Sequence, residues 1–270
     1  MADPAGRLRP YLRLAVAQVR SQAAYRTSFV LDLAANGVIL AADLLMVFVL
    51  FRLTPAVGGF GVAEVLLMFG LASVAFALAD LAVGSIERIR LYVRTGLLDA
   101  ILVRPLGVLS QLVAMDFAPR RVGRVASSLV LVAVAVPLAG IDWTPGRAIL
   151  LVVAPIAGAV FFAAIFVASA TVAFWWIESG ELGNAVTYGG RDFTSYPVTV
   201  YSGWFRRLFA YGLGFGFVAY YPALTLLGRA DPLGLPTWMG WICPAVAVVA
   251  AAAAAAVWRV GVRHYRSTGS

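Results

Sequence analysis

The polar side chains best placed to do chemistry in this sequence lie within long apolar segments. Asp32, Asn36 and Asp43 are separated by four and then seven residues, which places them on one face of a helix. Asp80 lies inside the next apolar segment. Exposing a carboxylate to lipid costs about 2–3 kcal/mol or more, so such groups face the protein interior or a water-filled path. Asn36, Asp43 and Asp80 therefore either line a route for a substrate or protons, or make hydrogen-bonded packing contacts between helices. Asp32 marks the membrane interface.

The sequence contains few of the residue types that catalysis requires. His264 is the single histidine and lies in a basic tail, and Cys243 is the single cysteine. The sequence therefore offers no nucleophile–histidine pair within the membrane, no multi-histidine metal site and no disulfide within the chain. The phosphate-binding pattern GxxxxGK[ST] is excluded, because the chain has no lysine. We expect no catalytic residue, metal or cofactor in this chain; if ATP and Mg²⁺ drive it, a separate chain must bind them.

The composition is that of an integral membrane protein. Of the 270 residues, 62% are hydrophobic and 13% are charged, and the mean hydropathy is +0.89. A soluble domain is about half apolar and a quarter charged. The length accommodates about six membrane spans of about 20 residues each and no large soluble domain. The net charge of +8 comes entirely from arginine, and its distribution favours contact with anionic lipid over nucleic acid.

The hydropathy pattern predicts an all-α polytopic membrane protein with a single transmembrane domain over residues 1–270. An amphipathic N-terminal helix within residues 1–28 is too polar to span and is expected to lie at the membrane interface. Two further segments, 87–124 and 178–207, are predicted to be cytoplasmic. The fifth apolar segment is broken by three glycines and a proline, so it is expected to be kinked or partly re-entrant. The six predicted spans are 29–51, 62–86, 125–141, 148–177, 208–227 and 238–258.

The distribution of arginine predicts the orientation. Short loops rich in arginine stay on the cytoplasmic side of a membrane. With both termini inside, the cytoplasmic segments hold 5, 7, 3 and 3 arginines, or 18 of 21, and Arg52, Arg147 and Arg229 fall outside. Arginine without lysine, together with much alanine, valine and glycine, is typical of a bacterial chain. We therefore predict a multi-pass protein of the bacterial cytoplasmic membrane with both termini in the cytoplasm.

Residues 87–124 combine a strong positive charge with an apolar stripe. Seven arginines stand against three acidic residues, and leucine or isoleucine recurs at three- and four-residue steps in the middle of the segment. Thr95 and Gly96 are expected to break the helix before Leu97, and Pro105 is expected to break it again. A short helix with an apolar face and an arginine fringe can insert into a groove of a partner protein. In the alternative, anionic lipid holds it at the interface.

Two sets of short motifs resemble those of a known family. The first is GLLD at residues 96–99, followed by LVRPL at residues 102–106. The second is Tyr196-Pro197 with Tyr201 and Arg206, leading to AYYPA at residues 219–223. In these strings, and in its layout over nearly the whole length, the chain resembles the membrane permeases of bacterial type 2 ABC exporters. It is most similar to the small six-span permeases that work with a second permease and a separate ATPase.

The resemblance implies a transport subunit rather than an enzyme. Its partners would be an ABC ATPase subunit that binds ATP and Mg²⁺, a second permease copy or homologue, and membrane lipids, but no nucleic acid. The two permeases would form the pathway for an amphipathic, lipid-like or drug-like substrate. The helix after the second span would dock on the ATPase as a coupling helix, while Asn36, Asp43 and Asp80 would belong to the pathway. The residues expected to contact the ATPase are Arg90, Arg94, Thr95, Gly96, Leu97, Asp99, Arg104 and Pro105.

Two other functions stay open at the level of the residues. A proton-coupled secondary transporter would use Asp43 and Asp80 and would need no ATPase. A non-transporting membrane anchor would tolerate charge changes at both positions. No motif specifies the substrate, the direction of transport, or the choice between a homodimer and a heterodimer.

Overall fold

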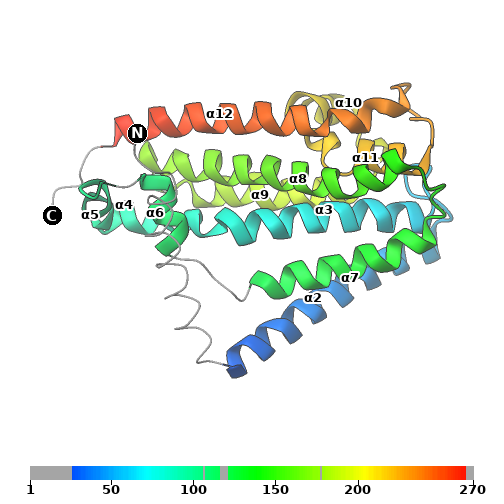
Figure 1. The fold of residues 1–270 in the computed structure, drawn as a ribbon, viewed down its shortest axis with the longest axis horizontal. Coiled ribbons are helices and arrows are strands. Elements are labelled where there is room, and N and C mark those ends of the chain that lie inside the picture. The colour runs from blue at the N-terminus through cyan, green and yellow to red at the C-terminus, as the bar shows by residue number, and fades with distance from the viewer. Residues whose placement is uncertain (1–25, 106, 116–120, 177, 266–270) are drawn as a thin grey trace.

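The computed structural model describes residues 26–105, 107–115, 121–176 and 178–265. Over these residues the chain is almost entirely helical and contains no β-strand, which confirms the predicted all-α class. The predicted interfacial helix within residues 1–28 lies outside the described residues, except for its last part, which begins the first long helix. The long helices run side by side in an elongated bundle (Figure 1).

Four helices of the described chain are long and apolar enough to cross a membrane, and each coincides with a predicted span. They are α2 (Arg26–Leu53), α3 (Val62–Val83), α8 (Pro145–Thr171) and α12 (Cys243–His264). The shorter apolar helix α7 (Val122–Leu138) coincides with the predicted third span. α8 packs between α12 and α3. On the other side of α3 lies α7, and α2 packs against α7 (Figure 1).

The core of the bundle lies between α3 and α8. Phe76 of α3 contacts Phe162 and Phe166 of α8, with ring centroids 5.3 and 5.5 Å apart. Gly158 of α8 faces Ala75 of α3 so closely that a Cβ at position 158 would lie 2.7 Å from the Ala75 methyl carbon. Small residues at such crossings let helix backbones approach, which is how helices gain packing contacts in a membrane. The two helices therefore form a tight central pair.

Most of the second segment predicted to be cytoplasmic, 178–207, packs along the bundle. Its helix α9 (Gly180–Ser195) lies against α3 and α8. The Arg90 guanidinium lies over the start of α9, and beyond its end the Thr199 hydroxyl donates to the Gly58 carbonyl oxygen at 2.7 Å. Because Arg90 and Gly58 lie beyond opposite ends of α3, α9 runs the length of the bundle. The polarity of the segment indicates a cytoplasmic position, but glycine and threonine are also residues that membrane helices bury against their neighbours.

The fifth predicted span, 208–227, is broken, as its glycines indicated. Its elements are α10 (Gly203–Arg206), the π-helix η5 (Arg207–Gly212), η6 (Phe215–Phe217) and α11 (Tyr220–Leu227). The two halves are bent by 61° at Gly214, whose φ of 88° favours glycine. Thr199 before the segment and Arg229 after it both contact the loop between α2 and α3. The segment therefore enters the bundle and returns to the same end, in the form of a re-entrant hairpin.

The chain continues from α3 into the predicted coupling segment at the other end of the bundle. Its elements are η1 (Gly84–Arg88), α4 (Ile89–Arg94), α5 (Leu97–Leu102) and α6 (Val108–Met115). The chain turns between α4 and α5 at Gly96, whose φ of 72° lies in the left-handed region. α5 ends before Pro105, as the sequence predicts. Leu106, the last residue of the first motif, lies outside the described residues. The end of α12 lies beside these helices (Figure 1).

Candidate transport pathway and coupling surface

A polar cavity of about 150 Å³ lies between α2, α3, α7 and α9. Two predicted pathway residues, Asn36 and Asp43, line it from α2. Their spacing predicts a shared helix face, and in the structure that face points toward the bundle. The other lining residues are Ile39, Leu40, Ser73, Phe76, Arg124, Ser127, Ser128, Tyr188 and Arg191. The cavity thus gathers polar groups from four helices that are far apart in the sequence.

Arg191 of α9 is the ion-pair partner of Asp43. Its Nη2 atom lies 3.2 Å from Asp43 Oδ2, and its guanidinium lies 5.7 Å from the centre of the Phe76 ring, within the range of a cation–π contact. The side chains of Arg191 and Asp43 are 26% and 34% exposed, so the pair is only partly shielded. This contact ties α2, whose described side chains are mostly exposed, to α9.

Asp80 lies outside the cavity lining and ties α3 to the start of α7. Its side chain is 4% exposed. Its Oδ1 atom lies 3.2 Å from Arg121 Nε, and its Oδ2 atom lies 2.7 Å from Arg124 Nη1. Arg121 Nη1 also donates to the Asp80 backbone carbonyl oxygen at 3.0 Å. A buried carboxylate held by two guanidinium groups matches the packing alternative more closely than a solvated route.

The helix α5 is anchored by one face and exposes the other. Leu98 and Ile101 are fully buried, and Gln111 Nε2 of α6 donates to the Ile101 carbonyl oxygen at 3.2 Å. On the other face, Leu97 is 52% exposed and Val103 just beyond the helix is 86% exposed. The other predicted contact residues that are exposed are Arg94, Thr95, Arg104 and Pro105. The result is an apolar surface with arginines at its edge, which we call the α4–α5 corner.

Asp99 joins this corner to the end of α12. It is partly buried on α5 and lies beside the hydroxyl of Tyr265, the residue that follows α12. Burial, and then the adjacent Asp99 carboxylate, raises the pKa of the Tyr265 hydroxyl above its usual value. Tyr265 also packs edge-to-face on Phe174, with centroids 6.0 Å apart. Asp99 therefore holds α5 against the end of α12, in addition to its predicted contact with an ATPase.

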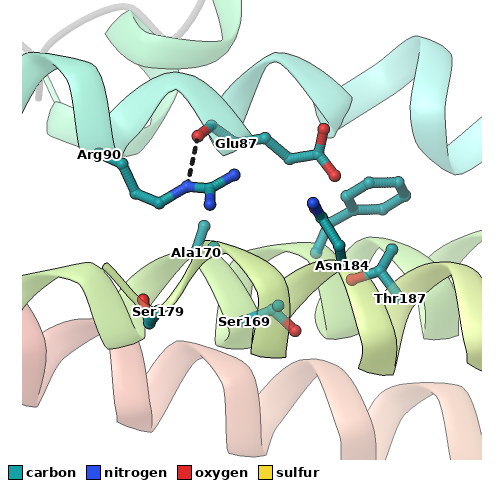
Figure 2. Close-up of a pocket in the computed structure, with 10 residues that line it drawn as sticks. Glu87, Arg90, Ser169, Ala170, Ser179, Asn184 and Thr187 are labelled. Carbon is teal, nitrogen blue, oxygen red and sulfur yellow. Dashed lines mark hydrogen bonds between the residues drawn. The ribbon is translucent and has the colours of Figure 1, made fainter. Parts of the chain in front are cut away.

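Arg90 points into the bundle rather than toward the α4–α5 corner (Figure 2). It lines a small pocket of about 20 Å³ between α4, α8 and α9, together with Glu87 and Asn184. Its Nε atom donates to the Glu87 backbone carbonyl oxygen at 3.4 Å. A Cβ at Gly180 would lie 1.4 Å from Arg90 Nη1, so glycine is needed there to make room. In this position, Arg90 is better suited to hold the start of α9 than to make the predicted contact with an ATPase.

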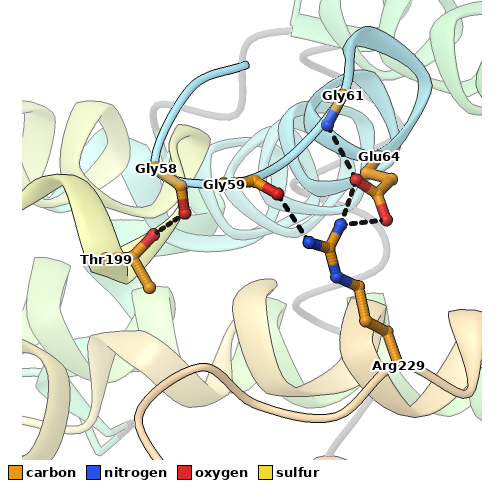
Figure 3. A network of polar contacts seen from close by, with 6 residues as sticks. All are labelled: Gly58, Gly59, Gly61, Glu64, Thr199 and Arg229. Carbon is orange, nitrogen blue, oxygen red and sulfur yellow. Dashed lines mark hydrogen bonds and ion pairs between the residues drawn. The ribbon is translucent and has the colours of Figure 1, made fainter.

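At the opposite end of the bundle, Arg229 joins the re-entrant segment to α3 (Figure 3). Its guanidinium contacts both carboxylate oxygens of Glu64 and the Gly59 carbonyl oxygen. It also lies 4.2 Å from the centre of the Phe60 ring. Glu64 in turn accepts a hydrogen bond from the Gly61 backbone N–H at 2.7 Å, next to the first turn of α3. Arg229 therefore links the end of the re-entrant segment to the first turn of α3 and to the loop before it.

Sequence reasoning missed Arg124, Arg191, Arg229 and Ser73 as residues of these sites. The sequence places Arg124 and Arg191 in the two predicted cytoplasmic segments and Arg229 outside, at a span end, because charge indicates solvent when no fold is known. A signal for Arg191 does exist. Residues 180–195 contain no proline, and small residues recur among them at helical spacing, which is compatible with a buried helix.

A family model with the description "ABC-2 family transporter protein" matches residues 38–269. This range includes every described helix except the first part of α2. It therefore contains the re-entrant segment, the α4–α5 corner and every residue that lines the cavity except Asn36. No match was found among curated proteins or among solved structures.

Proposed function

Because the chain belongs to the ABC-2 transporter family and is a multi-pass membrane component of a transporter, we propose that it is the permease subunit of an exporter driven by a separate ATPase. A second copy or a homologous permease would complete the pathway. The observation that carries the proposal is the α4–α5 corner, where Leu97 and Val103 are exposed beside Arg94 and Arg104.

The α4–α5 corner is suited to receive a movement and pass it on. A helical run of 33 residues, Val62–Arg94, connects it to the centre of the bundle, and the buried face of α5 fixes the corner to this run. Burying an aliphatic side chain contributes about 1.5–3 kcal/mol, so Leu97 and Val103 favour insertion into a groove. Arg94 and Arg104 add charge complementarity to an acidic rim. Displacement of α5 by a partner would then move α3.

We assign the end with the α4–α5 corner to the cytoplasm. Short arginine-rich connections stay on that side, and this end carries Arg88, Arg94 and Arg104 together with Arg263 in the last turn of α12. The end of α12 lies at the same end, where Tyr265 meets α5. The loop between α2 and α3 and the re-entrant segment then face the outside.

The proposed spans are α2, α3, α7, α8, α9 and α12. In this arrangement α9 replaces 208–227 as the fifth span. The 16 residues of α9 extend about 24 Å, and residues 196–200 complete the crossing to Gly58. The re-entrant hairpin then begins and ends on the outer side. With these spans, the chain would cross the membrane six times, and the start of α2 and the end of α12 would both lie inside.

One face of α9 needs a protein partner if the helix crosses a bilayer. Glu181, Tyr188 and Asp192 are exposed on it, at the seven- and four-residue spacing of a single helix face. Carboxylates facing lipid are costly, so a second permease packed on this face would stabilise both copies. The pathway between the two copies would then pass close to the cavity that Asp43 lines.

The ion pairs of the membrane carboxylates favour this reading over the proton-coupled one. Asp80 contacts two arginines and Asp43 contacts one. In each case the contact joins two different helices, which a packing role explains. Asn36 and Asp43 also line the cavity, whereas Asp80 does not, so we retain Asn36 and Asp43 as proposed pathway residues and give Asp80 a structural role beside the pathway.

The coupling contact is tested by reversing two charges in the chain co-expressed with the ATPase of its complex. In Arg94→Glu/Arg104→Glu, the ATPase should be lost on purification or should hydrolyse ATP without transport, because repulsion replaces attraction. The matched control Arg259→Glu/Arg263→Glu reverses two exposed arginines of α12 and should retain the ATPase. Wild-type retention and coupling in the first variant would contradict the proposal. Transport by the chain alone, driven by a pH gradient in liposomes, would support the proton-coupled alternative.

A further inference from the structure

We propose that the cavity between α2, α3, α7 and α9 binds the anionic headgroup, a phosphate or a carboxylate, of an amphipathic molecule. The inference rests on the proposed function, since it names the class of substrate that the permease carries. Three features of the cavity support it: the charges on its wall, a buried hydroxyl without a partner, and an apolar side that continues onto an exposed helix.

Cations outnumber anions on the cavity wall. Its charged lining residues are Arg124, Arg191 and Asp43. Asp80 lies behind the wall and contacts both Arg121, at 3.2 Å, and Arg124, at 2.7 Å, so Arg124 offers the cavity only the donors that Asp80 does not use. A guanidinium carries five N–H donors in a planar fork that matches a carboxylate or phosphate. The ion pairs use one part of each fork. An anion in the cavity can accept hydrogen bonds from the remaining donors of the two forks, whereas a cation would meet two arginines.

Ser73 supplies a neutral donor beside these arginines. It lines the cavity from α3, is 9% exposed, and its hydroxyl has no hydrogen-bond partner among the described residues. By contrast, Ser128 on the same wall donates to the Val125 carbonyl oxygen at 2.9 Å. Buried polar atoms in proteins are nearly always paired with protein, water or ligand. The Ser73 hydroxyl is therefore placed to donate to an oxygen of a bound headgroup.

The remaining wall is apolar and leads out of the bundle. Ile39 and Leu40 of α2 and Phe76 of α3 line the cavity. Ile39 is 52% exposed, and its neighbours Val38 and Met46 on α2 are 69% and 64% exposed. A cavity of about 150 Å³ holds several water molecules or one headgroup, but not a long tail as well. The polar end of an amphipath fits inside, and its tail can lie along the apolar surface of α2.

The test measures equilibrium binding of radiolabelled dodecyl phosphate to the full chain, purified with its ATPase in nanodiscs of zwitterionic lipid. Substitutions of the two partners of the Arg191–Asp43 ion pair should change the binding affinity in opposite directions. Arg191→Gln should weaken binding about tenfold or more, since it removes charged hydrogen bonds to the ligand. Asp43→Asn should tighten binding, because it removes the one lining carboxylate. Ser73→Ala should weaken binding about threefold. Arg263→Gln, an exposed arginine of α12, is the control and should bind like wild type.

The probes separate the sources of the anion. Dodecyltrimethylammonium should not compete with dodecyl phosphate, and inorganic phosphate should compete at least tenfold less well, because it lacks the tail. Equal competition by the cationic probe, or a parallel loss of binding in Arg191→Gln and Asp43→Asn, would overturn the proposal. Competition by inorganic phosphate at the concentration of dodecyl phosphate would overturn its amphipathic part. The thermal midpoint of each variant shows that it is folded. A complex that retains its ATPase but binds no dodecyl phosphate refutes this inference and leaves the proposed function standing, whereas loss of the ATPase from wild type refutes the proposed function.

Discussion

Replacing Asp80 by asparagine should destabilise the bundle by about 3 kcal/mol. The carboxylate is 4% exposed and contacts Arg121 and Arg124 at 3.2 and 2.7 Å. Removing one partner of a buried ion pair costs about 3–5 kcal/mol, because the opposite charge is left uncompensated. The Arg124 side chain is 41% exposed and can turn outward, so the lower end of this range applies.

The measurement is thermal unfolding of the purified chain in detergent. A loss of about 3 kcal/mol corresponds to a decrease in midpoint of roughly 6–12 °C for a chain of this size. The variant Asp80→Asn/Arg121→Gln/Arg124→Gln should regain most of the loss, since it removes the uncompensated charges together. Asp142→Asn is the matched control. That carboxylate is 97% exposed and lies 4.0 Å from its arginine partner, so the midpoint should not change.

Two outcomes would refute this account of Asp80. The first is a wild-type midpoint for Asp80→Asn, which would show that the ion pair does not hold α3 to α7. The second is a midpoint that stays low in the triple variant, which would place the cost in packing rather than in charge. A wild-type midpoint combined with abolished transport would return Asp80 to the proton-carrying role.

Three further changes test other parts of the structure. Gly96→Ala should reduce ATPase retention in pull-down, because a residue with a Cβ at a φ of 72° costs about 1 kcal/mol or more and shifts α5. Arg229→Gln should lower the unfolding midpoint, since its carboxylate partner in α3 is left unpaired. In a Cys243→Ala background, Glu178→Cys, at an exposed position just before α9, should react with an impermeant maleimide from inside only, and Ser202→Cys should react from outside only. Reaction of both from the same side would show that α9 does not cross.

The sequence alone was enough to predict the long apolar helices and the two breaks on either side of α5. α3 and α8 coincide with predicted spans because runs of apolar residues bounded by polar turns report burial or lipid contact directly. A helix break at Thr95 and Gly96 was predicted, and the turn lies at Gly96, where glycine takes the left-handed conformation at little cost. The end of α5 followed from the proline at 105 in the same way. These features are local, so nearby residue types are enough to indicate them.

Hydropathy could not predict that α9 packs along the bundle. Hydropathy measures the affinity of a segment for lipid, but α9 is covered on two sides by α3 and α8 and contacts them through small residues. Gly183, for example, faces Ser169 of α8, and a Cβ there would lie 3.6 Å from the Ser169 Cβ atom. A helix sheltered by protein can be polar and still run through the bundle, and hydropathy then underestimates its burial.

By itself, the sequence determined that this protein is helical, is suited to a membrane, and carries an arginine-edged corner with the motifs of an ABC permease. The tertiary structure decided which charges meet: Asp43 with Arg191, Asp80 with Arg121 and Arg124, and Glu64 with Arg229. It also decided that Arg90 points inward, where Gly180 makes room for it. The physical reason is that propensity and hydropathy act over neighbouring residues. The partner of a buried charge comes from another helix, and its position depends on how all the helices pack.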